Sequence, residues 1–261
     1  LEKVSQIIQE MKKYAGIQIA PGRLGEDNRL WHIDKENHTI SQSLQSIKYI
    51  SAVVAEELYQ MSNLKFEHFV NVLAYLQKNT SVDKRQIEAL IHVGYFSEFG
   101  KMQKLKLLFD DFFDGKRKMS KGLKLEKVKL ELETPNDDMP VGFKLQQEND
   151  LLKLCMSCDA SSPDLAYFVK DVDDTYGVKI ELYSVQRGSS GVMKMKKTMA
   201  EEAKSLVGKI ILISNWKKVQ RCSYKGKKRI PIPDEYDTWL YDYSLLSQGD
   251  DNCVSDSAEI C

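Results

Sequence analysis

The sequence lacks the marks of membrane, secreted and disulfide-bonded proteins. It contains no run of about 18 apolar residues that would cross a bilayer, and no apolar stretch near its start that would serve as a signal peptide. Its five cysteines form an odd set without regular spacing, which favours free thiols in a reducing compartment over a disulfide framework. We therefore expect a cytoplasmic protein without a membrane partner. Since the chain begins at Leu1 and not at a methionine, we also expect a fragment.

Residue patterns typical of catalysis and cofactor binding are missing as well. The histidines are scattered, no nucleophile has a partner base, and no phosphate-binding P-loop occurs. Cys155 and Cys158 have the spacing of half a zinc site, without a second pair. Asp171, Asp173 and Asp174 resemble the paired aspartates of polymerases but fit a strand-ending turn better. The sequence predicts no catalytic residue, no metal site and no cofactor in this chain.

The formal net charge is zero, yet the charges are separated along the chain. Between Arg187 and Arg229, thirteen Lys and Arg accompany only two acids, Glu201 and Glu202. Residues 234–261 hold eight acids and no base. A strongly basic run is what a phosphate-binding surface requires, because neutralised phosphates release counterions. A solvated lysine-rich face is the alternative. At the acidic end we expect a disordered tail.

Apolar residues recur at helical spacing throughout the first half of the chain. A short helix is predicted to end near Gly16, and residues 17–40 are expected to form loops with one short extended edge. In residues 41–61 one apolar stripe spans two helical pieces, with a break at residues 48–51. Further helices are predicted around residues 66–76, 87–91 and 105–113.

From about Asp114 the periodicity changes, and we place a domain boundary there. Short alternating runs predict strands, and one helix is predicted at residues 199–207. The runs lie at residues 123–132, 151–156, 166–169, 178–185, 192–195 and 210–213. Strands, then a helix, then a strand that follows a glycine is the connectivity of an OB-fold, a five-stranded barrel that binds single-stranded nucleic acid. An SH3-like barrel fits the periodicity as well.

Three stretches of the first half of the chain are informative in their order. They are IQIAPGRLGEDNRLWHI from Ile17, ISQSLQSIKYISAVVAEEL from Ile40 and LIHVGYFSEFG from Leu90. This order resembles the region behind the fingers of the bacterial DNA polymerase III alpha subunit, whose chains carry "GI-x-V-x-P-P", "I-x-x-G-L-x-x-I-K-G-V-G" and "L-I-x-x-G-x-F-D-x-x-G". The strand-turn-strand at residues 172–183 is similar to part of the OB-fold of that family. The resemblance covers most of residues 14–113 and residues 150–215.

The resemblance implies a helix-hairpin-helix at residues 41–61. In that motif the hairpin amides and the start of the second helix contact successive DNA phosphates without reading bases. Lys48 and Ser51 are then the side chains expected to bind duplex DNA. The family has glycines where this chain has Ser43, Tyr49 and Ser51, and a tyrosine is hard to reconcile with the positive backbone angle of the hairpin. A pair of packed helices without DNA contact is the alternative.

The predicted barrel carries the residues expected to bind a single strand. Binding of this kind needs cations for the backbone and aromatic rings on which bases stack. The expected residues are Tyr183, Arg187, Lys194, Lys196, Trp216, Lys217, Lys218 and Arg221. At a strand end Trp216 fits a barrel core equally well.

The sequence thus predicts an α+β protein, with an N-terminal helical domain that contains a degenerate helix-hairpin-helix and a small OB-fold-like β-barrel after it. The expected divisions are residues 1–40 (end of a fingers-like segment), 41–116 (helical domain), 117–149 (linker and short strands), 150–233 (barrel) and 234–261 (acidic tail).

We interpret the chain as a non-catalytic DNA-binding region of a replicative polymerase that grips primer-template duplex and single-stranded template. The resemblance implies a parent enzyme that adds deoxynucleotides with magnesium, and it places a sliding clamp and other replisome subunits among the expected partners. Residues 103–109 (QKLKLLF) loosely match a clamp-binding peptide and match a packed helix equally well. A stand-alone nucleic-acid-binding or replisome adaptor protein without polymerase activity, and a purely structural interaction module, are the alternatives.

Overall fold

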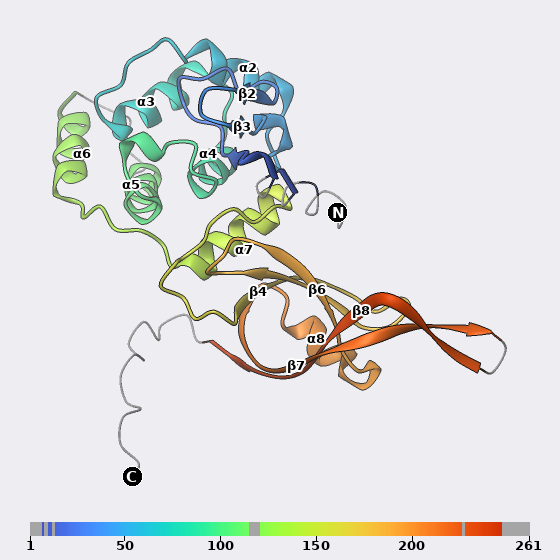
Figure 1. Cartoon of the computed structure of the whole chain (residues 1–261). Coiled ribbons are helices and arrows are strands. Elements are labelled where there is room, and N and C mark those ends of the chain that lie inside the picture. Colours follow the sequence, from blue (N-terminus) through green and yellow to red (C-terminus); the bar gives the residue numbers. More distant parts are fainter. Residues whose placement is uncertain (1–6, 8–9, 12–13, 115–120, 226–227, 247–261) are drawn as a thin grey trace. The chain divides into compact units, whose positions relative to one another are not determined.

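The chain folds into two compact units, Leu1–Met156 and Ser157–Cys261. The computed structural model describes Ile7, residues 10–11, 14–114, 121–225 and 228–246. The first unit is mostly helical with a small sheet, and the second is built on a closed five-stranded β-barrel (Figure 1). The predicted α+β class, with a barrel after a helical part, is confirmed at this level. None of the helices in the described ranges is long and apolar enough to span a lipid bilayer.

The first unit begins with a three-stranded sheet in place of the single extended edge that we expected. Its strands are β1 (Gln18–Ala20), β2 (His32–Asp34) and β3 (Thr39–Ser41). β3 lies in the middle, parallel to β1 and antiparallel to β2. Of the predicted first helix, Ile7, residues 10–11 and residues 14–15 are helical, and the other positions lie outside the described residues. Gly16 ends it with a φ of +65°, which favours glycine.

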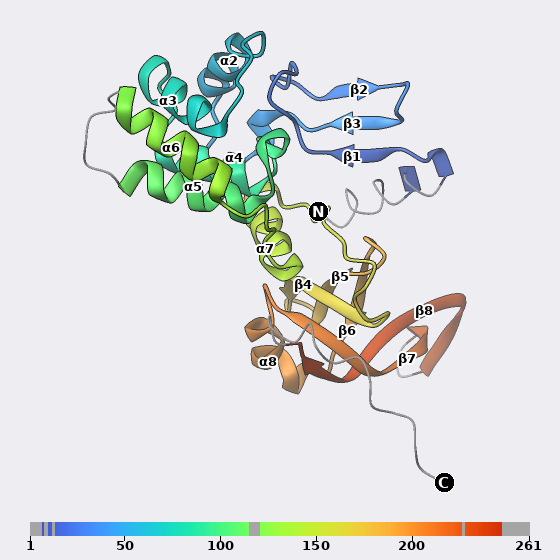
Figure 2. The same ribbon diagram turned by 90° about the vertical axis from the view of Figure 1, so that its left-hand side faces the viewer.

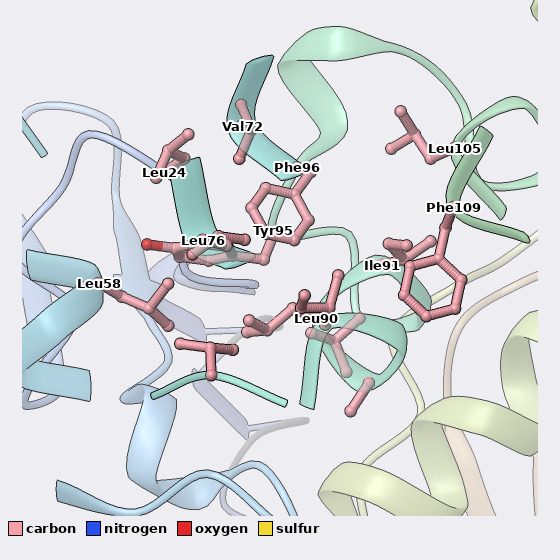
Figure 3. Close-up of a cluster of buried hydrophobic side chains, with 14 of the residues drawn as sticks. Leu24, Leu58, Val72, Leu76, Leu90, Ile91, Tyr95, Phe96, Leu105 and Phe109 are labelled. Carbon is pink, nitrogen blue, oxygen red and sulfur yellow. The ribbon is translucent and has the colours of Figure 1, made fainter. Parts of the chain in front are cut away.

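Helices form the rest of the first unit. They are η1 (Leu44–Ser46), α2 (Ala52–Gln60), α3 (Phe69–Asn79), α4 (Lys84–His92), η2 (Ser97–Phe99), α5 (Met102–Asp114), α6 (Lys121–Glu133) and α7 (Val141–Leu152). Their apolar faces meet in one core, where Leu58, Leu76, Leu90 and Phe96 are fully buried (Figure 3). The predicted helical periodicity of residues 66–76, 87–91 and 105–113 is therefore confirmed as α3, α4 and α5.

The boundaries of α4 follow from its sequence. Asp83 and Gln86 form a capping box at its start, each side chain accepting a hydrogen bond from the backbone amide of the other. At its end Gly94 has a φ of +81°, and the amide of Tyr95 donates to the carbonyl of Leu90 at 3.0 Å. Tyr95 and Phe96 are thereby turned into the core (Figure 3). The role of residues 90–96 in the structure is therefore to pack the core.

The predicted linker and short strands at residues 117–149 are wrong, because α6 and α7 occupy most of that range and belong to the first unit. The run at residues 123–132 alternates Lys and Leu, which imitates a strand. Lys, Leu and Glu are nevertheless strong helix formers. In the helix these leucines are spread around the axis, so Leu125 and Leu132 remain 72% and 71% exposed. α6 lies beside α5 and also contacts α3 (Figure 2). The expected strand at residues 151–156 is the end of α7 and a loop.

The second unit is a closed barrel with OB-like connectivity. Its elements are β4 (Ala166–Asp173), β5 (Lys179–Ser184), β6 (Ser190–Lys194), η3 (Lys197–Met199), α8 (Ala200–Ser205), β7 (Ile210–Lys225) and β8 (Lys228–Leu245). The order around the barrel is β4-β5-β6-β8-β7, and β6 and β8 are parallel. α8 stands between the third and fourth strands, as an OB-fold requires. Ile180, Leu182, Ile211 and Leu240 fill the interior.

The barrel extends further along the chain than the expected residues 150–233. β8 runs to Leu245, so the first part of the predicted acidic tail is a strand, and residues 247–261 lie outside the described ranges. The acids of β8 alternate with Tyr, Trp and Thr, which favour strands, and β7 offers a complete partner. β7 and β8 continue beyond the barrel wall as a long two-stranded ribbon (Figure 1).

Candidate nucleic-acid interface

The first candidate interface is the hairpin segment, residues 47–51, between η1 and α2. The predicted break in the stripe of residues 41–61 is present, although the piece before it is a single 3-10 turn and not a full helix. Tyr49 has a φ of +76°, so the hairpin adopts the positive angle that we expected a tyrosine to disfavour. Its strain is offset by neighbours, because Gln86 Nε2 donates to the Tyr49 carbonyl at 3.1 Å and the Arg85 guanidinium stacks 3.6 Å from its ring centroid.

Lys48 and Ser51, the two side chains predicted to bind duplex DNA, lie on the surface of the hairpin segment. Ser51 is the N-cap of α2, and its Oγ accepts a hydrogen bond from the Val54 amide at 3.3 Å. The backbone amide of Lys48 donates to the Leu151 carbonyl at 2.9 Å. The amides of Tyr49 and Ser51 donate to no residue in the described ranges. These two amides and the first turn of α2 are thus open to an acceptor such as a phosphate oxygen.

Two cations converge on the same place. The Nζ of Lys48 is 5.1 Å from the Tyr49 ring centroid, on whose ring Arg85 also stacks. A hydrogen bond with Lys48, and to a smaller extent one with Arg85, lowers the pKa of the Tyr49 hydroxyl below its usual value. Among the described residues neither Lys48 nor Arg85 forms an ion pair with a carboxylate. We call Lys48, Tyr49, Ser51 and Arg85 the hairpin cluster.

The sequence reasoning missed Arg85, which is distant from the hairpin segment along the chain. A signal was present in its position. Lys84 and Arg85 are cations in the first turn of α4, where the helix dipole disfavours positive charge. The Nζ of Lys84 donates to the Phe113 carbonyl at 3.3 Å, whereas Arg85 stacks on Tyr49 of the hairpin segment.

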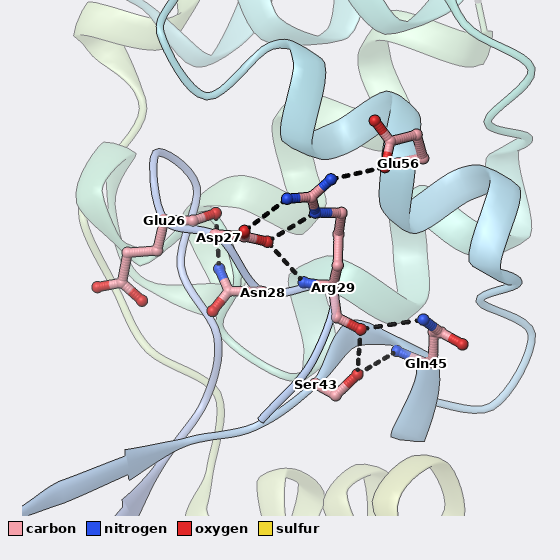
Figure 4. A network of polar contacts seen from close by, with 7 residues as sticks. All are labelled: Glu26, Asp27, Asn28, Arg29, Ser43, Gln45 and Glu56. Carbon is pink, nitrogen blue, oxygen red and sulfur yellow. Dashed lines mark hydrogen bonds and ion pairs between the residues drawn. The ribbon is translucent and has the colours of Figure 1, made fainter. Parts of the chain in front are cut away.

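Arg29 holds the elements on both sides of the hairpin segment (Figure 4). Its guanidinium donates to both carboxylate oxygens of Asp27, at 2.8 and 2.7 Å, and to Glu56 of α2 at 3.0 Å. Its carbonyl accepts hydrogen bonds from Ser43 Oγ at 2.9 Å and Gln45 Nε2 at 3.0 Å. The hydrogen bond from Arg29 holds the pKa of Asp27 below its ordinary value. η1 and α2 are therefore fixed to one loop, which sets the geometry of the hairpin segment between them.

In the second unit, the structure divides the predicted single-strand residues into different environments. Tyr183 is only 4% exposed, so no base can stack on its ring, and the prediction for this residue is wrong. It belongs to the outward face of β5, whose next outward residue, Glu181, pairs with the buried Lys170. Barrels of this class often use the outer face of the second and third strands for binding. Here that face holds an internal ion pair and a buried ring.

Three of the predicted cations are neutralised by acids of the same unit. Arg187 pairs with Asp164 at 3.4 Å, Lys194 with Asp237 at 2.6 Å, and Arg221 with Glu235 at 2.9 Å. Two of these acids lie in the part of β8 that we had assigned to an acidic tail. The pairing of β7 with β8 thus cancels part of the charge separation seen along the sequence.

Two of the other predicted cations, Lys217 and Lys218, lie on opposite faces of the β7–β8 ribbon. In its regular ladder Lys218 is opposite Thr238 and Lys217 is opposite Trp239. Neighbours along a strand point to opposite faces, so Lys217 and Lys218 do not share a surface. The Nζ of Lys217 lies 5.9 Å from the Tyr241 ring centroid. Lys196 is exposed at the start of η3, away from this ladder.

One face of the ribbon combines aromatic rings with a cation. Trp216, Lys218 and Gln220 alternate along β7, and Tyr236 and Thr238 stand opposite Gln220 and Lys218. Trp216 is 42% exposed and Tyr236 is 56% exposed, so Trp216 is not a barrel-core residue. Lys218 forms no ion pair within the described ranges. We call Trp216, Lys218 and Tyr236 the aromatic platform.

Two exposed tyrosines escaped the sequence reasoning. Tyr236 was overlooked because it lies in the supposed tail. Tyr176 is 93% exposed in the turn between β4 and β5, which corresponds to a loop that binds oligonucleotides in OB-folds. An aromatic residue inside a turn, next to Gly177 with its φ of +116°, was the available signal.

Within the described ranges, no cluster of three or more His, Cys, Asp or Glu has the arrangement of a metal site. The segment that loosely matched a clamp-binding peptide lies within α5, and its Leu105, Leu108 and Phe109 are buried in the helical core. A comparison with protein-family models finds no match, and a comparison with curated proteins finds none either.

Proposed function

We propose that this chain is a non-catalytic DNA-binding region of a replicative polymerase similar to the DNA polymerase III alpha subunit, with the barrel on a single strand and the hairpin cluster on the duplex. The aromatic platform is the observation that carries the proposal. An OB-like barrel presents two exposed rings around a cation without an acidic partner, which is the combination that single-strand binding needs.

The hairpin cluster supports the duplex part. Two unpaired cations, two open amides and the first turn of α2 lie together, and all of them recognise phosphate and not base edges. The arrangement differs from a full helix-hairpin-helix, because η1 is one turn long and Tyr49 replaces a glycine. The contact it supports is therefore independent of sequence and sensitive to salt.

Fluorescence anisotropy with labelled oligo-dT and with a labelled primer-template, across a series of salt concentrations, tests both parts. Trp216→Ala should weaken oligo-dT binding by about 1–3 kcal/mol, the value of one stacked base. Lys48→Ala and Arg85→Ala should each reduce the salt slope for the primer-template by about one. Lys209→Ala and Lys101→Ala, at exposed lysines outside both surfaces, are the controls.

The measurements on the barrel and on the hairpin cluster give separate answers. If Trp216→Ala binds oligo-dT like the parent chain, the platform is not a stacking surface. Should the Lys48 and Arg85 variants match the controls, the hairpin segment is a structural turn. A parent chain that shows no salt-dependent binding to either DNA would leave the chain as an interaction module.

A further inference from the structure

A hollow of about 500 Å³ lies beside α3 in the first unit, apart from the hairpin cluster. α3 contributes Asn71, Tyr75 and Lys78, which are spaced four and three residues apart and so share one stripe of the helix. Lys65 comes from the loop before α3, and Lys124 comes from α6. α6 is held against α3 (Figure 2), so three separate segments form one wall of basic side chains.

The charge of the hollow is unbalanced. Lys65, Lys78 and Lys124 form no ion pair with any carboxylate in the described ranges. Glu67 is the single acidic residue among the described lining residues, which leaves a formal charge of about two positive from the three lysines and one glutamate. Lysines gathered without counter-charges repel one another, and an anion of matching charge relieves that repulsion. A phosphate monoester carries about −1.5 to −2 at neutral pH.

The hollow also has an aromatic side. The ring of Tyr75 meets Phe66 edge to face, with centroids 5.6 Å apart, which fixes its orientation. The side-chain oxygen of Asn71 has no hydrogen-bond donor among the described residues. That oxygen is closed to solvent, so it lies behind the surface of the hollow and does not take part in the binding proposed below.

We propose that this hollow binds a nucleoside monophosphate, with its phosphate held by Lys65, Lys78 and Lys124 and its base packed against Tyr75. The three cations correspond to the phosphate of such a ligand, and the oriented aromatic ring corresponds to its base. The proposal does not rest on DNA binding by the barrel or by the hairpin cluster.

Calorimetric titration of the full chain with adenosine 5′-monophosphate, adenosine and inorganic phosphate tests it. The nucleotide should bind, and Lys78→Ala and Lys124→Ala should each weaken it by about tenfold or more, the loss expected for a charge-assisted hydrogen bond. Lys129→Ala, at another exposed lysine of α6 without an ion pair in the described ranges, should leave it unchanged. Tyr75→Leu should reduce the affinity for the nucleotide to that for inorganic phosphate.

Trp216→Ala should bind the nucleotide like the parent chain, so that failure of the DNA proposal and failure of this one can be told apart. Equal binding of inorganic phosphate and nucleotide would overturn the nucleotide assignment. Unchanged nucleotide binding in the Lys78 and Lys124 variants would overturn the site itself. All of the charge variants change exposed side chains, and circular dichroism confirms that they fold.

Discussion

At the scale of single residues, Glu131 shows how one carboxylate joins two helices. It lies on α6 and is 5% exposed, and its two oxygens accept hydrogen bonds from the amides of Phe69 and Val70, each at 2.9 Å. These amides are in the first turn of α3 and have no partner inside that helix. A negative charge at this end also suits the helix dipole. This role could not be predicted from sequence patterns, because the partners are more than sixty positions away.

Glu131→Gln should therefore lower the free energy of unfolding by about 1.5–3 kcal/mol, the range for hydrogen bonds to a charged group. Gln keeps one acceptor but loses the charge and the second bond. Urea denaturation measures the change. Glu133→Gln, at an exposed position on the same helix, should shift stability by less than about 0.5 kcal/mol. Equal effects of the two substitutions on the free energy of unfolding would contradict the proposal that Glu131 caps α3.

His92 is the second residue with a defined consequence. It is 7% exposed, its ring meets Phe143 edge to face at 5.4 Å, and its Nε2 has no partner in the described ranges. Burial lowers the pKa of its imidazole, while the nearby Glu88 and Lys106 act in opposite directions. The folded chain therefore resists protonation of this ring.

The sign of the pH dependence follows. The unfolded chain has an ordinary imidazole pKa of about 6.5 and takes up the proton first, so stability falls as the pH drops from about 7 and levels off below the folded pKa. The slope of this fall is at most about 1.4 kcal/mol per pH unit. Urea midpoints between pH 7 and 5 should show this fall in stability in the parent chain and in the exposed-site control His32→Gln. In His92→Gln the fall should be absent. If it persists in that variant, the pH dependence comes from other groups.

At the scale of elements, the β7–β8 ribbon decides how much positive charge the barrel presents. Asp237 binds Lys194 at 2.6 Å and lies 3.5 Å from Arg221, so one carboxylate holds two cations on the face opposite the aromatic platform. An acid in this place lowers the positive potential of the ribbon and so limits non-specific attraction of polyanions.

Asp237→Asn should release Lys194, while Arg221 keeps its ion pair with Glu235 at 2.9 Å. The salt slope for binding of oligo-dT should then steepen by about one, because the freed cation can neutralise a phosphate. Anisotropy titrations at several salt concentrations measure this. Asp242→Asn changes the net charge equally at an exposed position without an ion pair in the described ranges, and it should alter the slope less. Identical slopes in the two variants would mean that overall charge is decisive.

How far elements could be predicted depended on the match between local pattern and final packing. The α4 helix and its glycine stop were predictable, since periodicity, cap and core all agree at residues 83–96. The barrel connectivity was predictable from strands, a helix and Gly208, whose φ is +82°. α6 was missed because its leucines alternate and yet pack only partly. Of the aromatic platform, Trp216 and Lys218 were predicted and Tyr236 was not. Tyr236 lies in β8, whose acidic residues led us to expect a disordered tail there.

At the scale of the whole molecule, the chain forms two cores, one before Met156 and one after it. The cysteines near this junction differ in access. Cys155 is 6% exposed and its Sγ lies 3.9 Å from the Leu145 carbonyl, whereas Cys158 is exposed, and neither forms a disulfide. The first core therefore ends with a packed thiol.

Brief alkylation of the native chain, read by mass spectrometry, should modify Cys158 and spare Cys155, because a buried thiol reacts only after local opening. In urea both should react. Rapid modification of Cys155 under native conditions would show that the end of the first core opens readily.

The parallel pairing of β6 with β8 also orders events during synthesis. Until the last strand has left the ribosome, β6 keeps an unsatisfied edge and β7 has no ribbon partner, whereas the helical unit already possesses all of its neighbours. A nascent chain that pauses before Leu245 thus carries an open sheet edge, and aggregation through that edge is most favoured in the interval before β8 pairs.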